Sequence, residues 1–303
     1  MNTIGEPSSC KNVMAVGASQ SEGDRIYTGD KGRWHLADFS SRGPTMDGRI
    51  KPDVVAVGYT LLAPRAKAKE NGQEEVFETF GTSFSAPVVA GSAALIRQYF
   101  EEGWSPCGTK GCNKAIVPSG SLVKAVLING AESLLSVQKV PSGPVTESLS
   151  EYDNNQGFGM INLVKSIPIK KFNDLNAVVI NNRSIRDGDT QIITIRIKQC
   201  RSKKTSVTLT WYDPAGAANC ARCLVNDLDL LVKNGGQTFH PNGGVSSDRI
   251  NNVERVRVEA SAGTEIKITV NAHNLATESQ KYSLIATGCF DAVTEKSTEG
   301  ILS

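Results

Sequence analysis

Long apolar runs, a strong net charge and abundant histidine are all missing from this sequence. Lys and Arg together number 33 and Asp and Glu 31, so the formal net charge of the 303-residue chain is +2. A charge this small gives no argument for binding to nucleic acid or to an anionic membrane surface. No apolar run approaches the roughly 20 residues that a membrane-spanning helix needs. We therefore expect neither a nucleic acid partner nor a membrane span.

The first residues also lack the features of a leader. "MNTIGEPSSCKNVMAVG" has neither a basic start nor the cleavable apolar core of a signal peptide. It leads at once into an apolar strand around Val13 and Val16, which is typical of the middle of a domain. We expect the chain to begin within a domain.

The seven cysteines cannot all pair with one another. Two pairs are close in sequence, in "CGTKGC" (107–112) and in "CARC" (220–223). They could form disulfides in an oxidising compartment or supply four zinc ligands. We favour loop disulfides, with Cys10, Cys200 and Cys289 as buried free thiols, because the two loops lie in different predicted domains.

Residues 1–168 alternate short β-branched strands with helical segments, which indicates part of a parallel α/β sheet. The helix predicted in "SAPVVAGSAALIRQYF" (85–100) has almost no polar face, so we expect it to be buried on all sides. A second helix is predicted in "SLVKAVLINGA", with Ser121 as its N-cap and Gly130 just past its end.

The pattern changes to period two after about Ile169. "QIITIRIK", "VTLTWY" and "EIKITVNA" each alternate apolar with polar residues between turn-forming clusters. This predicts an antiparallel β-sandwich or jelly roll over residues 169–290, with one face of each sheet buried and the other solvated. Residues 291–303 are predicted to be a polar, frayed tail.

"GTSFSAP" supplies a candidate nucleophile, Ser83. A serine attacks a carbonyl only if a base takes its proton and the oxyanion is stabilised. Gly81 allows close backbone approach, and the free N–H groups of a helix beginning here would favour a developing negative charge. The structural alternative is that Thr82 and Ser83 only cap the helix.

The chain resembles the subtilisin-like serine peptidases. Gly81, Thr82, Ser83 and Pro87 match the family's nucleophile segment, and "FSSRGPTMDGRIKPDVVAVG" (39–58) and "KNVMAVGAS" (11–19) resemble the segments before it. "SLVKAVLINGA" and "NQGFGMINL" resemble the end of its catalytic domain, so that the likeness covers about residues 3–168. It implies a serine endopeptidase that cleaves proteins or peptides through an acyl-enzyme on Ser83 and needs no cofactor for the chemistry.

A second, looser resemblance covers the rest of the chain. "VTLTWYDPAG", "LVNDLDLLV", "NNVERV" and "QKYSLIATG" are similar to the β-sandwich that follows the catalytic domain in a calcium-using branch of these peptidases. For the full-length parent, this family favours secretion or an endomembrane lumen.

The other members of the family's catalytic triad have no counterpart here. The family orders its triad Asp, His, Ser, a pattern for which subtilisin is itself the standard example. His35, His240 and His273 are the three histidines, and none lies in the family's glycine-rich His motif. Asn2 lies too close to the following strand to match the oxyanion-hole asparagine. We expect the C-terminal portion of a catalytic domain, inert alone.

Two rival functions remain open. The chain could be a non-catalytic binding or structural remnant of a protease. An esterase is disfavoured, because "GTSFS" lacks the glycine two residues after the serine that a nucleophile elbow needs.

Oxygen-rich loops in the second half suggest calcium. The candidate ligands are Asn226, Asp227 and Asp229 in "NDLDL", with Asn251, Asn252 and Glu254 in "NNVE". The alternative is that Asp227 and Asp229, which share one face of a strand, bond neighbouring backbone. Asn182 in "NRS" is a candidate glycosylation acceptor in a secretory compartment.

Overall fold

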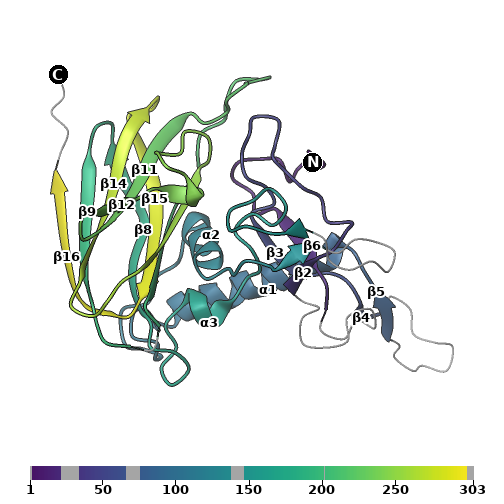
Figure 1. Ribbon diagram of the computed structural model, residues 1–303, viewed down its shortest axis with the longest axis horizontal. Helices are drawn as coiled ribbons and strands as arrows, with labels where there is room; N and C mark the ends of the chain where they lie inside the picture. The colour runs from purple at the N-terminus through teal and green to yellow at the C-terminus, as the bar shows by residue number, and fades with distance from the viewer. Residues whose placement is uncertain (1, 22–33, 66–75, 138–146, 201, 299–303) are drawn as a thin grey trace.

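The computed structural model describes residues 2–21, 34–65, 76–137, 147–200 and 202–298. A β-sandwich lies at one end and a smaller mixed sheet at the other, with the helices between them (Figure 1). The predicted boundary near Ile169 falls between the last helix and the first strand of the sandwich.

The smaller sheet has the order β3-β1-β2-β6-β7. Its strands are β1 (Val16–Ser19), β2 (His35–Leu36), β3 (Val54–Val57), β6 (Ser136–Val137) and β7 (Glu147–Ser148). The central pair β1–β3 is parallel, as is β2–β6, whereas β1–β2 and β6–β7 are antiparallel. The predicted parallel sheet is therefore only partly correct. A separate hairpin joins β4 (Leu61–Pro64) to β5 (Val76–Thr79).

Three helices lie between this sheet and the sandwich: α1 (Thr82–Glu101), α2 (Gly120–Asn129) and α3 (Leu163–Ser166). The N-cap of α2 is Ser119, whose Oγ accepts a hydrogen bond from the N–H of Leu122 at 3.1 Å. The predicted cap, Ser121, is instead buried against the sandwich, where its hydroxyl lies 2.9 Å from that of Ser283. The prediction that Gly130 follows the helix is confirmed.

The prediction that α1 is buried on all sides is wrong. Its buried residues are Ser85, Val89, Ile96, Tyr99 and Phe100, which lie on one side of the helix. The opposite side is open although it is apolar: Val88 is 43% and Leu95 56% exposed. No described element covers that side, so composition alone overstated the burial of the helix.

The sandwich consists of two antiparallel sheets, with the orders β13-β10-β15-β8 and β12-β11-β14-β9-β16. Its elements are β8 (Asn176–Arg186), β9 (Thr190–Ile197), β10 (Lys204–Trp211), β11 (Asn226–Asn234), β12 (Gln237–Phe239), the 3-10 turn η2 (Pro241–Gly243), β13 (Val253–Glu259), β14 (Glu265–Leu275), β15 (Ser279–Gly288) and β16 (Phe290–Thr298). Apolar side chains from both sheets, among them Ile195, Leu209, Leu230 and Leu284, form one core. The predicted alternation of apolar and polar residues thus builds this core.

The last strand corrects the predicted tail. β16 pairs along its length with β9, from Phe290 opposite Ile197 to Thr298 opposite Thr190. Residues 291–298 are therefore an edge strand and not a frayed tail. The tail was predicted because the side chains of residues 291–298 are mostly polar. An edge strand, however, is held by backbone hydrogen bonds to its neighbour and needs little apolar surface.

The expectation that the outer face of each sheet is solvated is wrong for one of the two sheets. Helix α2 packs across β10 and β15 and buries the polar side chains of Thr208, Thr210, Ser283 and Thr287. Asn129 at the end of α2 donates to Thr287 Oγ1 at 2.6 Å and accepts from Thr208 Oγ1 at 3.0 Å. The two domains thus share a hydrogen-bonded interface.

The disulfides Cys107–Cys112 and Cys220–Cys223 form as predicted. A third, Cys200–Cys289, joins two cysteines predicted to be free, across a sequence separation of 89 residues. Cys10 is free as predicted, but it is exposed and not buried. The Cys200–Cys289 pair could not be predicted from the sequence because its two cysteines lie far apart in the chain. They meet because Cys200 follows β9 and Cys289 follows β15. Over the described ranges, no helix has the length and apolar character to cross a membrane.

Candidate functional site

The glycine turn before α1 presents Ser83. Gly81 has φ 134°, in the region that favours glycine, and its N–H donates to the carbonyl of Gly58 at 2.7 Å. Gly58 in turn donates to the carbonyl of Ser19 at the end of β1, at 3.0 Å. The start of the helix is thereby fixed to the ends of β1 and β3.

Gly58 is required by this close approach. A Cβ there would lie 2.1 Å from Ser85 Oγ and 3.0 Å from the carbonyl oxygen of Gly81. Such contacts would displace the turn that carries Ser83. The sequence therefore places a glycine where the strand end and the helix start meet.

Ser83 lies in the first turn of α1 and is exposed, as predicted. The first turn has no acidic residue, and its N-cap, Gly81, makes no side-chain capping bond. Within the described part of the chain, neither Thr82 nor Ser83 makes a side-chain hydrogen bond, so nothing supports the capping alternative. The helix N-terminus offers free N–H groups and a positive dipole end beside the Ser83 hydroxyl.

The histidines lie elsewhere. His35 is buried in β2, with its Nδ1 2.5 Å from Ser136 Oγ on β6. His240 follows β12, and His273 lies on β14 with its Nδ1 4.0 Å from Asp229 Oδ2. None of the three is hydrogen-bonded to Ser83. The site thus has a nucleophile candidate without a base in the described residues.

An aromatic cluster that sequence reasoning missed adjoins this turn. The rings of Phe39, Tyr59 and Phe80 lie 5.7 to 5.8 Å apart, centroid to centroid. Phe80 immediately precedes Gly81 and is 65% exposed. Phe39 begins the 39–58 motif, Tyr59 follows it and Phe80 precedes the Ser83 motif, but only the fold brings the three together. They give the site an apolar wall in which Phe80 is exposed and Phe39 and Tyr59 are half-buried.

The side chains of the calcium candidates make hydrogen bonds and ion pairs with other residues. The Asn226 amide donates to Thr277 and Gln280, both at 2.7 Å, and its oxygen accepts from the Ala276 N–H. Its side chain is therefore already satisfied. Asp227 and Asp229 were alternatively expected to bond neighbouring backbone. Both carboxylates instead contact the side chain of Arg249.

The carboxylates of this cluster are poorly solvated. Burial raises the pKa of Asp227 to about 6, against the opposing effect of Arg249. Burial also raises the pKa of Glu254 well above its usual value, although Glu254 accepts from the Leu230 N–H at 2.5 Å. Asn251 accepts from the Ile50 N–H, and Asn252 donates to the Trp211 carbonyl. Among the described residues, no three His, Cys, Asp or Glu side chains gather in a group that could hold a metal ion. Calcium binding at Asn226, Asp227 and Asp229 stays a prediction.

The fold thus fixes a glycine turn to the ends of β1 and β3 and places the exposed Ser83 in the first turn of α1. The family model described as Peptidase_S8, the subtilase family, matches residues 1–159. The chain belongs to the subtilase family, and the resemblance drawn from its motifs is confirmed.

Curated relatives extend this likeness into the second half. The chain is 26% identical over 308 residues to the serine protease/ABC transporter B family protein tagB of Dictyostelium discoideum, covering 84% of this chain and 16% of that protein. It is 27% identical over 205 residues to the subtilisin-like protease SBT3.1 of Arabidopsis thaliana, covering 63% of this chain and 25% of that protein. Pyrolysin of Pyrococcus furiosus is 31% identical over 188 residues, covering 56% of this chain and 12% of that protein. The chain thus spans only a small part of the length of these relatives.

Proposed function

We propose that this chain is the nucleophile-bearing part of a subtilisin-type serine endopeptidase. Ser83 attacks the carbonyl carbon of a peptide bond, its proton passes to a histidine base, and the leaving amine departs from an acyl-enzyme that water then hydrolyses. The N–H groups at the start of α1 stabilise the oxyanion, and the wall of Phe39, Tyr59 and Phe80 contacts apolar side chains of the substrate. The single observation that carries this proposal is the exposed Ser83 on the glycine turn of a subtilase-family chain.

The base and its orienting carboxylate belong, in this proposal, to a longer parent protein. Two observations support this. No histidine contacts Ser83, and the apolar side of α1 that carries Val88 and Leu95 has no cover among the described elements. Without a base the Ser83 hydroxyl stays protonated at neutral pH, so the 303-residue chain alone is inactive.

Three finer points are part of the same proposal. The second domain is of the jelly-roll type. The disulfides support an oxidising compartment for the parent, secreted or lumenal, as part of this proposal. Calcium binding at Asp227 and Asp229 stays a prediction that requires Arg249 to withdraw first.

The rival is a non-catalytic remnant retained for its sandwich. The observation that favours it is the same lack of a base beside Ser83. The two functions differ in whether the longest natural product of the gene has a reactive Ser83.

Labelling with a fluorophosphonate probe tests both, because the probe needs a serine activated by a base. We expect no labelling of the purified 303-residue chain. The longest natural product, isolated with an antibody against the sandwich, should be labelled at Ser83, as should its Ser85→Ala variant but not its Ser83→Ala variant. An unlabelled natural product would reject the peptidase and favour the remnant. Labelling of the 303-residue chain would instead show that a base is present in it.

A further inference from the structure

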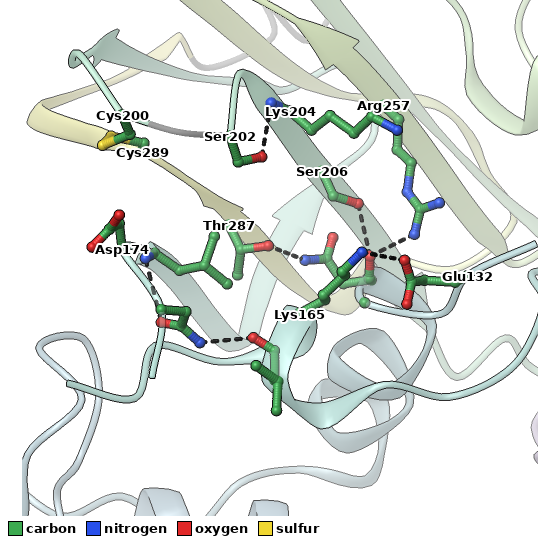
Figure 2. Close-up of a pocket in the computed structure, with 15 residues that line it drawn as sticks. Glu132, Lys165, Asp174, Cys200, Ser202, Lys204, Ser206, Arg257, Thr287 and Cys289 are labelled. Atoms are coloured by element: carbon green, nitrogen blue, oxygen red, sulfur yellow. Dashed lines mark hydrogen bonds and ion pairs between the residues drawn. A yellow bond between two sulfur atoms is a disulfide. The ribbon is translucent and has the colours of Figure 1, made fainter. Parts of the chain in front are cut away.

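A cavity of about 320 Å³ lies where the two domains meet. The end of α2, helix α3 and the following segment form one side, and β10, β13 and β15 form the other (Figure 2). It is separate from Ser83, which does not line it. A volume of this size is within the range of pockets that hold small organic molecules.

The two ends of the cavity differ in chemistry. Figure 2 shows Lys165, Lys204 and Arg257 reaching the side where Glu132 lies, and the Cys200–Cys289 disulfide on the opposite side. Val164 and Leu175 add apolar surface to the lining. Asp174, beside the disulfide, is exposed at the rim.

The cationic end carries an excess of positive charge. Lys165 is paired with Glu132, so these two charges balance. Glu151 is shared by Arg255 Nη2 at 3.0 Å and Arg257 Nη1 at 2.7 Å, so one carboxylate serves two guanidinium groups. Lys204 has no ion-pair partner among the described residues, and Glu259, opposite it in register, makes no ion pair with it.

Lys204 and Arg257 are positioned to act together. Ser206 is paired with Arg257 on the neighbouring strand, and Lys204 lies two residues before Ser206, so Lys204 and Arg257 are diagonal neighbours on one face of the sheet. Lys204 is exposed, whereas Arg257 already donates to Glu151 and to the Ala131 carbonyl, so the Lys204 ammonium is the cation at this wall of the cavity that has no ion-pair partner among the described residues. Two cations on one wall of a cavity favour an anion there. The hydroxyls of Ser206 and Thr287 belong to the same lining and are both hydrogen-bonded to Asn129.

We propose that this interdomain cavity binds a small organic carboxylate with an apolar body. The carboxylate lies at Lys204 and Arg257, and the apolar body extends over Val164, Leu175 and the disulfide. A free organic acid and the C-terminal carboxylate of a short peptide share this chemistry. Binding at this cavity does not require peptidase activity, so a failure of the proposed function would not affect this proposal.

Calorimetric titration of the full 303-residue chain tests the charge requirement. The probes are 4-phenylbutyrate as a free acid and N-acetyl-leucine as a peptide C-terminus, each compared with its uncharged amide. We expect saturable binding of one molecule per chain for at least one of the acids, and binding on the order of tenfold weaker for its amide. The acid that binds more tightly identifies the source of the carboxylate.

Three variants locate the site. Lys204→Met should weaken binding of the acid on the order of tenfold and leave the amide unchanged, whereas the neighbouring Lys203→Met should change neither. Leu175→Trp, which fills the apolar end, should abolish binding of both. Melting temperatures of the variants show that each one is folded.

Three outcomes would overturn the proposal: no saturable binding of either acid, equal binding of acid and amide, or undiminished binding by Lys204→Met. If Leu175→Trp does not fold, Val164→Trp replaces it at the same end of the cavity. Undiminished binding by a folded variant of this kind would place the ligand elsewhere.

Discussion

Arg255 on β13 joins the two domains through a single side chain. It is fully buried, and its guanidinium carbon lies 4.8 Å from the ring centroid of Tyr152 and 5.1 Å from that of Phe158. Its Nη1 donates to the carbonyls of Ile128 and Ala131 at 2.8 and 3.1 Å, at the C-terminal end of α2. Burial lowers its pKa to about 10, so it is still charged at neutral pH. A cation thus stabilises the negative end of the helix dipole from the other domain.

Replacing Arg255 by Met should lower the free energy of unfolding by about 3 kcal/mol, because the Ile128 and Ala131 carbonyls and Glu151 each lose one of their donors and a buried cation is removed from the end of α2. Urea unfolding followed by circular dichroism measures this. The control is Arg183→Met, which breaks the half-exposed ion pair with Glu295 and should cost less than about 1 kcal/mol. Equal losses in the two variants would show that Arg255 does not hold the domains together.

Asp227 predicts a pH dependence of stability. Its pKa is about 6 in the folded protein, above the ordinary value of 3.8, so the folded state binds more protons between these values. Its contribution to stability is fully present below about pH 4 and is lost as the pH rises through about 6. Asp227→Asn should therefore remove part of the fall in unfolding free energy across this window. Parallel pH profiles for wild type and variant would contradict the raised pKa.

At the scale of elements, α1 has an apolar side that faces solvent. Leu95→Lys should change the unfolding free energy by less than about 0.5 kcal/mol and make the chain more soluble. Its neighbour Ile96 is fully buried, and Ile96→Ala should cost about 3 kcal/mol. Denaturation and light scattering of the two variants check this.

The same substitution tests whether a longer parent covers this side of α1. In such a parent, Leu95→Lys would bury an unpaired charge and should be strongly destabilising. A parent that tolerates Leu95→Lys as well as the 303-residue chain does would contradict the proposed cover.

The Cys200–Cys289 disulfide constrains the sandwich more than the short loops do. It closes a separation of 89 residues, whereas Cys107–Cys112 closes one of 5. Loop-closure entropy predicts a loss of about 4.6 kcal/mol for the Ser double variant of the long bridge and about 2 kcal/mol for the short one. Thermal unfolding of both variants measures the order, and a larger loss from the short bridge would contradict the entropic account.

At the scale of the whole molecule, the interface makes the two domains depend on each other. The residues that α2 buries include Thr208 and Thr210, and the core beside α2 contains Val253 and Ile285 of the sandwich. We expect the full chain to unfold in one calorimetric transition. Residues 169–303 alone, which keep their own core, should melt at a lower temperature than the full chain. Two transitions, with the upper one matching the isolated sandwich, would show that the interface contributes little.

Local patterns determined much of this protein. The strands of the sandwich followed from alternation, as at Ile193 and Ile195, because period two places such residues on one face. The Ser83 turn followed from glycine and helix-start chemistry, because both act over a few residues. The subtilase family followed from motifs in order.

Only the tertiary structure decided which surfaces meet. The polar faces of β10 and β15 lie under α2, while the apolar face of α1 remains open, and the residue types alone suggested the reverse. Three further features also join residues that lie far apart in the chain: the Cys200–Cys289 disulfide, the hydrogen bonds from Arg255 to the end of α2, and the cavity lined by Lys204. Periodicity specifies which side of an element is apolar, but burial depends on whether another element lies against that side, and that is a property of the whole fold.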